Sequence, residues 1–94
     1  KAASWAYFDT SVLVKRYVKE DGSTTARRLL QRYRILSSAI APVEILSTIA
    51  RRQAAGELIQ RDALAIGARL HKDRAYWELV EVGAMVLSHA EEFV

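Results

Sequence analysis

Two acidic residues stand at positions that could support metal-dependent chemistry. Asp9 closes the short apolar run WAYF and is followed directly by two hydroxyl residues, Thr10 and Ser11, while Glu44 comes much later, two positions after Pro42. Hard divalent cations such as Mg²⁺ prefer oxygen ligands, and a bound cation can polarise a phosphoryl oxygen and help to make hydroxide from water. If the fold brings the two carboxylates together, they form a candidate metal site.

The elements that must position these acids follow from the spacing of apolar residues. Short apolar runs predict strands, and apolar residues recurring every three or four positions predict helices between them. The expected order is a strand over 4–9, a helix over 11–18, a helix from 23, a strand over 35–40, a helix from 42 to near 56, a helix over 60–77, a strand over 77–82 and a helix from 84.

Strands separated by helices imply crossover connections and a parallel sheet. The predicted fold class is therefore α/β, a single three-layer α/β/α domain over residues 1–94. Ligands gather beyond the carboxyl ends of the strands in such sheets. Asp9 ends the first expected strand and Glu44 lies in the first turn of the helix after the second, so we expect both at one edge. Two carboxylates in one cleft repel each other unless a cation joins them.

A purely structural interpretation of the same acids stays open. Asp9 and Glu44 each lie near the start of an expected helix, where a negative charge is favoured by the positive end of the helix dipole. Thr10 or Ser11 can cap the first helix. Their hydroxyls could equally orient a carboxylate or a water molecule.

Composition bounds the class of protein. The chain has 94 residues, of which 51% are hydrophobic and 27% charged, which suits one small folded domain. The absence of cysteine excludes disulfides and thiolate chemistry and is consistent with a cytoplasmic protein. No apolar run approaches the length of a membrane span. We expect an incomplete domain, because the chain starts at Lys1 and stops at Val94 inside an apolar pattern.

Basic residues give the chain a net charge of +3. Four of them lie on the expected helices that also carry the acids and could hold RNA phosphates: Lys15, Arg16, Arg51 and Arg52. A second arginine group at 27–34 is interpreted first as a solvated helix face. Trp5 and Trp77 fall in expected strands, which favours core packing over base stacking.

Two stretches resemble a known family. YFDTSVLVKRYVKEDG at 7–22 and SSAIAPVEILSTIARR at 37–52 resemble PIN domains, especially the VapC-like toxins of bacterial toxin–antitoxin systems. The resemblance extends more loosely to residue 94. It implies a PIN-like fold whose C-terminal part is missing, and an endoribonuclease that uses Mg²⁺ or Mn²⁺. Asp9 matches the first acidic ligand of the family, Glu44 the second, and Ser11 a hydroxyl position beside the first.

The same resemblance implies partners and a departure. VapC-like proteins bind a cognate antitoxin and a second toxin subunit, so we expect both an antitoxin and a homodimer. The later aspartates of the family have no match here, because Asp62 and Asp73 fall in the wrong element and Glu91 and Glu92 come too early. This fragment is therefore expected to hold metal weakly, and it could be inactive.

Two other functions remain under consideration. The fold fragment could be a non-catalytic module that binds an antitoxin or a second subunit. A phosphotransferase with Asp9 as nucleophile is ranked low, because enzymes of that kind place a second aspartate where this chain has Ser11.

Overall fold

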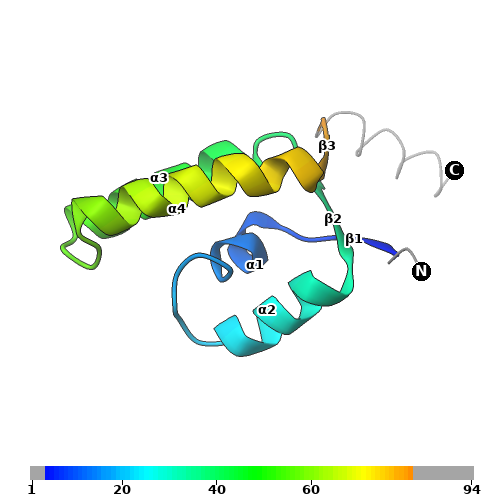
Figure 1. Cartoon of the computed structure of the whole chain (residues 1–94), viewed down its shortest axis with the longest axis horizontal. Helices are drawn as coiled ribbons and strands as arrows, with labels where there is room; N and C mark the ends of the chain where they lie inside the picture. Colours follow the sequence, from blue (N-terminus) through cyan, green and yellow to red (C-terminus); the bar gives the residue numbers. More distant parts are fainter. Residues whose placement is uncertain (1–3, 82–94) are drawn as a thin grey trace, which may run out of the picture.

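The computed structural model describes residues 4–81 (Figure 1). Its elements in chain order are β1 (Trp5–Tyr7), α1 (Thr10–Val14), α2 (Ser23–Arg32), β2 (Arg34–Ser38), α3 (Ala41–Ala54), α4 (Gln60–Asp73), the short 3₁₀ helix η1 (Arg74–Tyr76) and β3 (Glu78–Val80). Strands alternate with pairs of helices as the sequence predicts. The expected helix from 84 lies outside the described residues.

The three strands form one parallel sheet in the order β1-β2-β3. Trp5 is the register partner of Arg34, and Leu36 is the partner of Glu78. Each crossover passes through a pair of helices, as parallel pairing requires. The α/β class and the parallel sheet expected from the sequence are therefore confirmed.

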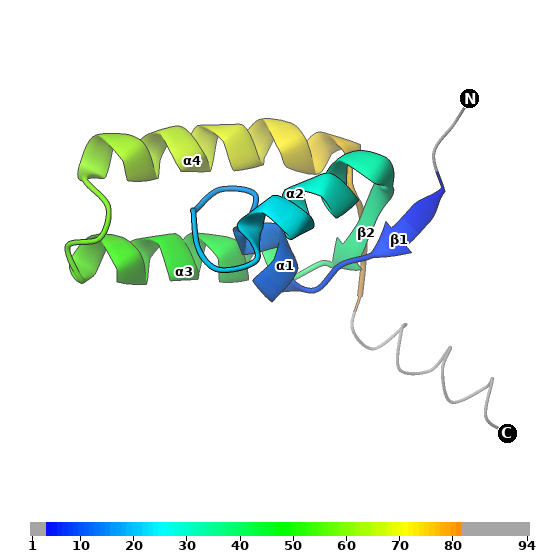
Figure 2. The same ribbon diagram turned by 90° about the horizontal axis from the view of Figure 1, so that it is seen from below.

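The helices α1 to α4 all lie on one side of the sheet, as both views show (Figures 1 and 2). Both crossovers step in the same direction across the sheet, and right-handed connections then place their helices on the same face. Residues 4–81 thus supply two layers of the three that were expected. A helical layer on the other face would have to come from outside the described residues.

The hydrophobic core fills the space between this face of the sheet and the helices. Leu13 and Ile45 are completely buried there, and Tyr17, Val18 and Trp77 pack around them. Deleting a buried leucine or isoleucine side chain typically costs about 2–5 kcal/mol, so these residues fix how α1 sits against α3.

Local details differ from the sequence-based expectations. The first helix has only five residues, Thr10–Val14, and continues as turns that still bury Tyr17 and Val18. The expected 60–77 helix ends at Asp73 and tightens into η1. The expectation that Trp5 packs in the core is wrong: it lies on the outer face of the sheet with 44% of its surface exposed.

That outer position follows from strand alternation. Trp5 and Tyr7 point away from the helices, whereas Ala6 between them points inward and packs against the core. The guanidinium of Arg34, the register partner of Trp5, lies 4.2 Å from the centre of a Trp5 ring. A cation over the ring stabilises this half-exposed tryptophan in place of apolar packing.

A partly buried polar cluster ties the α1 region to α4. Asp73 Oδ2 accepts hydrogen bonds from Arg16 Nε at 2.9 Å and from the Tyr17 hydroxyl at 2.6 Å. Burial and the bond to Asp73 raise the pKa of Tyr17 well above its usual range, so the phenol stays protonated and donates. Partial burial tends to raise the pKa of Asp73, but the bonds from Arg16 and Tyr17 outweigh it and lower that pKa.

Replacing Asp73 with asparagine should lower the free energy of unfolding at neutral pH by about 1 kcal/mol, because a charge-assisted pair is lost at a half-exposed site. Urea titrations at several pH values measure it. The carboxylate is held more tightly folded than unfolded, so its contribution is complete above the ordinary pKa of 3.8 and disappears as the pH falls below that value. Asp21→Asn, in an exposed turn, is the control. A difference from wild type that does not shrink as the pH is lowered below this value would contradict this account.

Candidate active site

Asp9 lies just beyond the carboxyl end of β1, where it begins α1. Its Oδ1 accepts a hydrogen bond from the backbone N–H of Val12 at 3.2 Å and another from the Ser11 hydroxyl at 2.7 Å. The expectation that Thr10 or Ser11 caps this helix is therefore wrong, because the cap is Asp9 itself. A carboxylate accepts from an N–H at the helix start at least as well as a hydroxyl does.

The second strand fixes the backbone that leads into Asp9. The buried hydroxyl of Ser37 donates to the carbonyl of Phe8 at 2.7 Å, and the Phe8 N–H donates to the carbonyl of Leu36 at 2.9 Å. Phe8 is itself buried in the core. The residue before Asp9 is thus held on both its backbone groups, which limits how far the acid can shift.

Glu44 lies in the first turn of α3, where the sequence places it. Its Oε1 accepts a hydrogen bond from the Thr10 hydroxyl at 2.7 Å, and Thr10 is the residue next to Asp9. The expectation that the fold brings the two acidic segments together is confirmed by this contact. Both hydroxyls after Asp9 orient carboxylates, Ser11 that of Asp9 and Thr10 that of Glu44.

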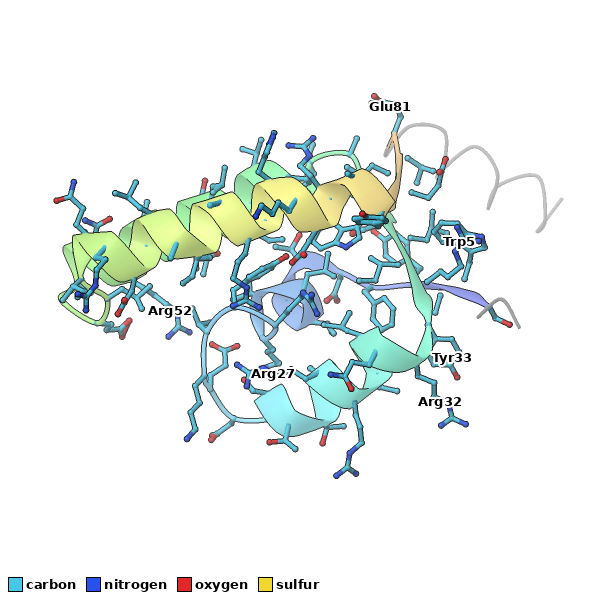
Figure 3. All side chains as sticks on the ribbon, in the orientation of Figure 1. Trp5, Arg27, Arg32, Tyr33, Arg52 and Glu81 are labelled. Carbon is cyan, nitrogen blue, oxygen red and sulfur yellow. The ribbon has the colours of Figure 1, made fainter. Side chains whose placement is uncertain are left out.

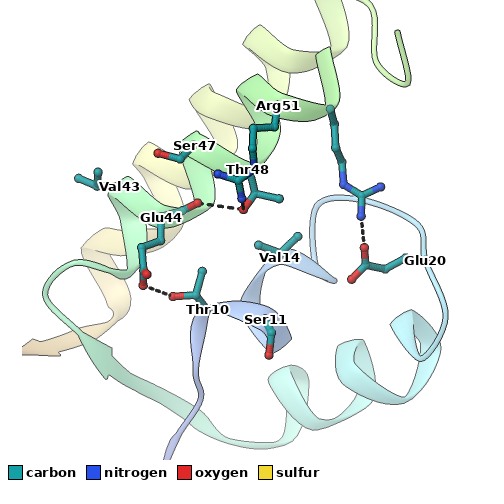
Figure 4. A pocket seen from close by; sticks show the side chains of 10 residues that line it. Thr10, Ser11, Val14, Glu20, Val43, Glu44, Ser47, Thr48 and Arg51 are labelled. Carbon is teal, nitrogen blue, oxygen red and sulfur yellow. Dashed lines mark hydrogen bonds and ion pairs between the residues drawn. The ribbon is translucent and has the colours of Figure 1, made fainter. Parts of the chain in front are cut away.

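A cleft of about 610 Å³ opens between α1 and α3 beside this contact (Figure 4). Thr10, Ser11 and Val14 line it from α1, and residues of α3 including Glu44 line the opposite wall. Asp9 itself does not line the cleft; its exposed side chain accepts a hydrogen bond from Ser11 on the α1 wall. The cleft is large enough for a substrate group, since ligand sites typically occupy about 300–1,000 Å³.

The four basic residues expected near the acids are placed differently from one another. Arg51 and Arg52 line the cleft, with Arg51 donating to the Thr48 hydroxyl at 3.1 Å. Arg52 pairs with Glu20, whose other oxygen accepts from Lys15 at 2.9 Å. The structure does not bring Arg16 to the cleft.

The carboxylates offer a limited metal-binding set. Within residues 4–81, no group of three or more acidic or histidine side chains is arranged to hold a metal ion. Asp9 and Glu44 each use one carboxylate oxygen in the hydrogen bonds described, and no hydrogen bond within the same part of the chain involves Asp9 Oδ2 or Glu44 Oε2. One or two carboxylates with several waters is a common way to hold Mg²⁺. The donor set therefore fits a weakly held cation.

A comparison with models of protein families identifies the family of this chain. The family model for the PIN domain matches residues 6–94. The chain belongs to the PIN domain family. Comparison with curated proteins and with solved structures found no match. PIN domains are generally nucleases that use divalent metals, which supports a nuclease role in general terms and agrees with carboxylates at the carboxyl ends of the strands of this PIN domain.

None of the helices within residues 4–81 has the length and apolar character needed to cross a bilayer.

Sequence reasoning missed Glu20 as part of this PIN domain's site. The segment EDG at 20–22 is typical of a turn, yet Glu20 lines the cleft, where it pairs with Arg52, and it also pairs with Lys15 outside the cleft lining. No local sequence pattern indicates Glu20, because only the folded turn after α1 carries it back toward α3. Thr48 likewise lines the cleft, one helical turn after Glu44, a spacing that could have indicated it.

Two variants of Asp9 can separate its role as a helix cap from any role in chemistry. Asp9→Ala should lower the free energy of unfolding by about 1 kcal/mol, because the N–H of Val12 loses its side-chain acceptor and keeps only the Asp9 carbonyl. Asp9→Asn should lower the free energy of unfolding by only a few tenths of that amount, since an asparagine side chain caps a helix nearly as well. Chemical denaturation of both variants measures the difference. Equal losses would mean that charge, not capping, accounts for the contribution of Asp9.

Proposed function

We propose that this PIN domain is a metal-dependent endoribonuclease, the toxin component of a toxin–antitoxin pair, with Asp9 and Glu44 as ligands for Mg²⁺ or Mn²⁺. The observation that carries the proposal is the Thr10–Glu44 hydrogen bond, which joins the segment of Asp9 to the first turn of α3. The membership of the chain in the PIN family supports a nuclease in general, and the motifs at 7–22 and 37–52 support the toxin assignment.

The residues of the cleft have distinct parts in this proposal. Thr10 and Ser11 each occupy one carboxylate oxygen, and the remaining oxygens of Glu44 and Asp9 would be the ones to hold the cation. A bound cation would polarise the scissile phosphoryl group and favour hydroxide over water. The hydroxyl of Ser11, on the cleft wall beside Asp9, holds the first carboxylate in place, which is a positioning role.

The basic residues position the RNA rather than react with it. Arg51 is exposed on α3, one and two turns beyond the other cleft residues Thr48 and Glu44. A guanidinium there can take a phosphate next to the one that is cleaved. Arg52 and Lys15 can contribute only if an RNA phosphate competes with Glu20 for them.

An interaction role is the second candidate, favoured by exposed apolar side chains on the α3–α4 pair. Val43 and Leu46 on α3 and Leu64 on α4 are all exposed, by 65%, 46% and 67%. Exposed apolar groups on neighbouring helices suit a protein partner. We propose a cognate antitoxin and a second copy of the chain as partners of this PIN domain.

Metal binding is the first test of the proposed function. Mn²⁺ titrated into the protein, followed by electron paramagnetic resonance of free Mn²⁺, should give saturable binding. Asp9→Asn and Glu44→Gln should each weaken it at least tenfold, because each removes one of two anionic ligands. Asp62→Asn changes an exposed acid in the first turn of α4, outside the cleft lining, and serves as the matched control. Unchanged binding in both site variants would end the assignment.

Cleavage is the second test. Labelled single-stranded RNA incubated with the protein and Mn²⁺ should be cut internally, and a chelator should stop the reaction. Thr10→Val should lower the rate by about tenfold while leaving the fold intact, since it releases Glu44 from a single exposed hydrogen bond. If the protein binds Mn²⁺ but no RNA is cut, the interaction role is the one to keep.

A further inference from the structure

Two cavities away from the cleft adjoin on the opposite side of the α1 region. One, of about 340 Å³, is lined by Arg16, Arg27, Gln31 and Arg69. The other, of about 270 Å³, is lined by Arg16, Leu30, Tyr33, Arg34, Ile35, Asp73, Tyr76 and Trp77. Arg16 lines both, so the two cavities lie next to each other along its side chain; together they are named here the α2–α4 groove, between α2 on one side and α4 with η1 on the other.

The first half of the α2–α4 groove is cationic. Three guanidinium groups from three different segments line it, and Asp73 pairs with only one of them, Arg16. Within residues 4–81, no carboxylate oxygen lies within 4.0 Å of the guanidinium nitrogens of Arg27 or Arg69. The Arg69 guanidinium instead lies 5.3 Å from the ring centre of Tyr17. Arg27 and Arg69 thus have no ion-pair partner within this part of the chain, although the charge of Arg69 is near enough to Asp73 to help lower the pKa of that carboxyl.

The number of donors favours a phosphate over a carboxylate. Arginine presents a planar fork of N–H donors that matches phosphate oxygens two at a time. Arg27 and Arg69 supply two such forks, and the amide of Gln31 adds a further donor. A carboxylate has two oxygens and would leave part of this set unused, whereas a phosphate group can accept from all of it.

The second half of the α2–α4 groove is aromatic. Tyr33, Tyr76 and Trp77 line it beside Leu30. Tyr76 is 82% exposed, although a large aromatic side chain gains most stability when it is packed. Figure 3 shows Tyr33 at the end of α2, and Arg27 on the same helix nearer its start. An aromatic half next to a cationic half matches the base and the phosphate group of a nucleotide.

We infer that the α2–α4 groove binds a nucleotide unit, with the phosphate between Arg27 and Arg69 and the base against Tyr76. Stacking on an exposed aromatic beside an arginine-lined path is how single-stranded nucleic acids are held without sequence preference. The unit can come from an RNA strand or from a free nucleotide. The RNA source rests on the proposed function, whereas the groove itself does not.

The test measures binding separately from cleavage. Fluorescence anisotropy of a short labelled single-stranded RNA is followed in the presence of a chelator, with Asp9→Asn as the background so that no cleavage intervenes. Calorimetry with AMP is the second arm. Arg27→Gln, Arg69→Gln and Tyr76→Ala should each weaken binding about tenfold, because each removes a charged or stacking contact.

Matched controls remove the same charges nearby. Arg28→Gln on α2 and Arg61→Gln on α4 change exposed arginines that do not line the groove, and they should leave affinity within about twofold. All these positions are exposed at the surface, and circular dichroism with thermal melting checks that each variant is folded.

The outcomes separate the alternatives. Binding of the RNA alone supports an RNA strand as the source, and binding of AMP as well supports a free nucleotide. Equal losses in the control variants would reduce the effect to general charge attraction and overturn the proposal. The proposal would also be overturned if the arginine variants lost affinity and Tyr76→Ala did not. The same holds if a glutamate-rich peptide bound as tightly as the RNA. Failure of RNA cleavage, by contrast, leaves the α2–α4 groove untouched.

Discussion

The candidate site depends on the parallel pairing of β1 with β2. Because Tyr7 is paired with Leu36 in this register, β1 and β2 end at the same edge of the sheet, where β1 leads into α1 and β2 leads into α3. Ser37 then fixes the end of β1 by donating to the carbonyl of Phe8. A slip of one residue would turn Ser37 outward and release the backbone before Asp9. The contact between Thr10, next to Asp9, and Glu44 is therefore a consequence of sheet geometry.

Two hydroxyl groups orient the carboxylates of the candidate site. Thr10 and Ser11 each engage a single carboxylate oxygen, one on Glu44 and one on Asp9. Asp9 has a second task, because the same oxygen that Ser11 contacts also begins α1. One oxygen therefore belongs to the helix start. In the proposed function the other oxygen would be the one available to a cation.

Much of this arrangement could be predicted from the sequence. Short apolar runs indicated all three strands, and the position of each acid after its strand indicated their meeting. The cap at Asp9 could not be foreseen, because aspartate and serine both cap helices and only the local backbone decides between them. The exposure of Trp5 could not be foreseen either, since a three-residue strand carries too few positions to show which face is buried. The pairing of Arg16 with Asp73 depends on how α4 returns past α1, which no local pattern records.

The ion pairs around the cleft have a consequence for the attraction of polyanions. Lys15 and Arg52 already face Glu20, and Arg16, away from the cleft, faces Asp73. In the proposed function an RNA phosphate reaches Lys15 or Arg52 only by displacing Glu20, so the exchange adds little net neutralisation of the strand and releases few of the cations condensed on it. Among the four basic residues considered for RNA, Arg51 has no such carboxylate partner within residues 4–81. Binding of RNA at the cleft would then depend on shape and metal coordination more than on bulk charge, and would change little with salt concentration.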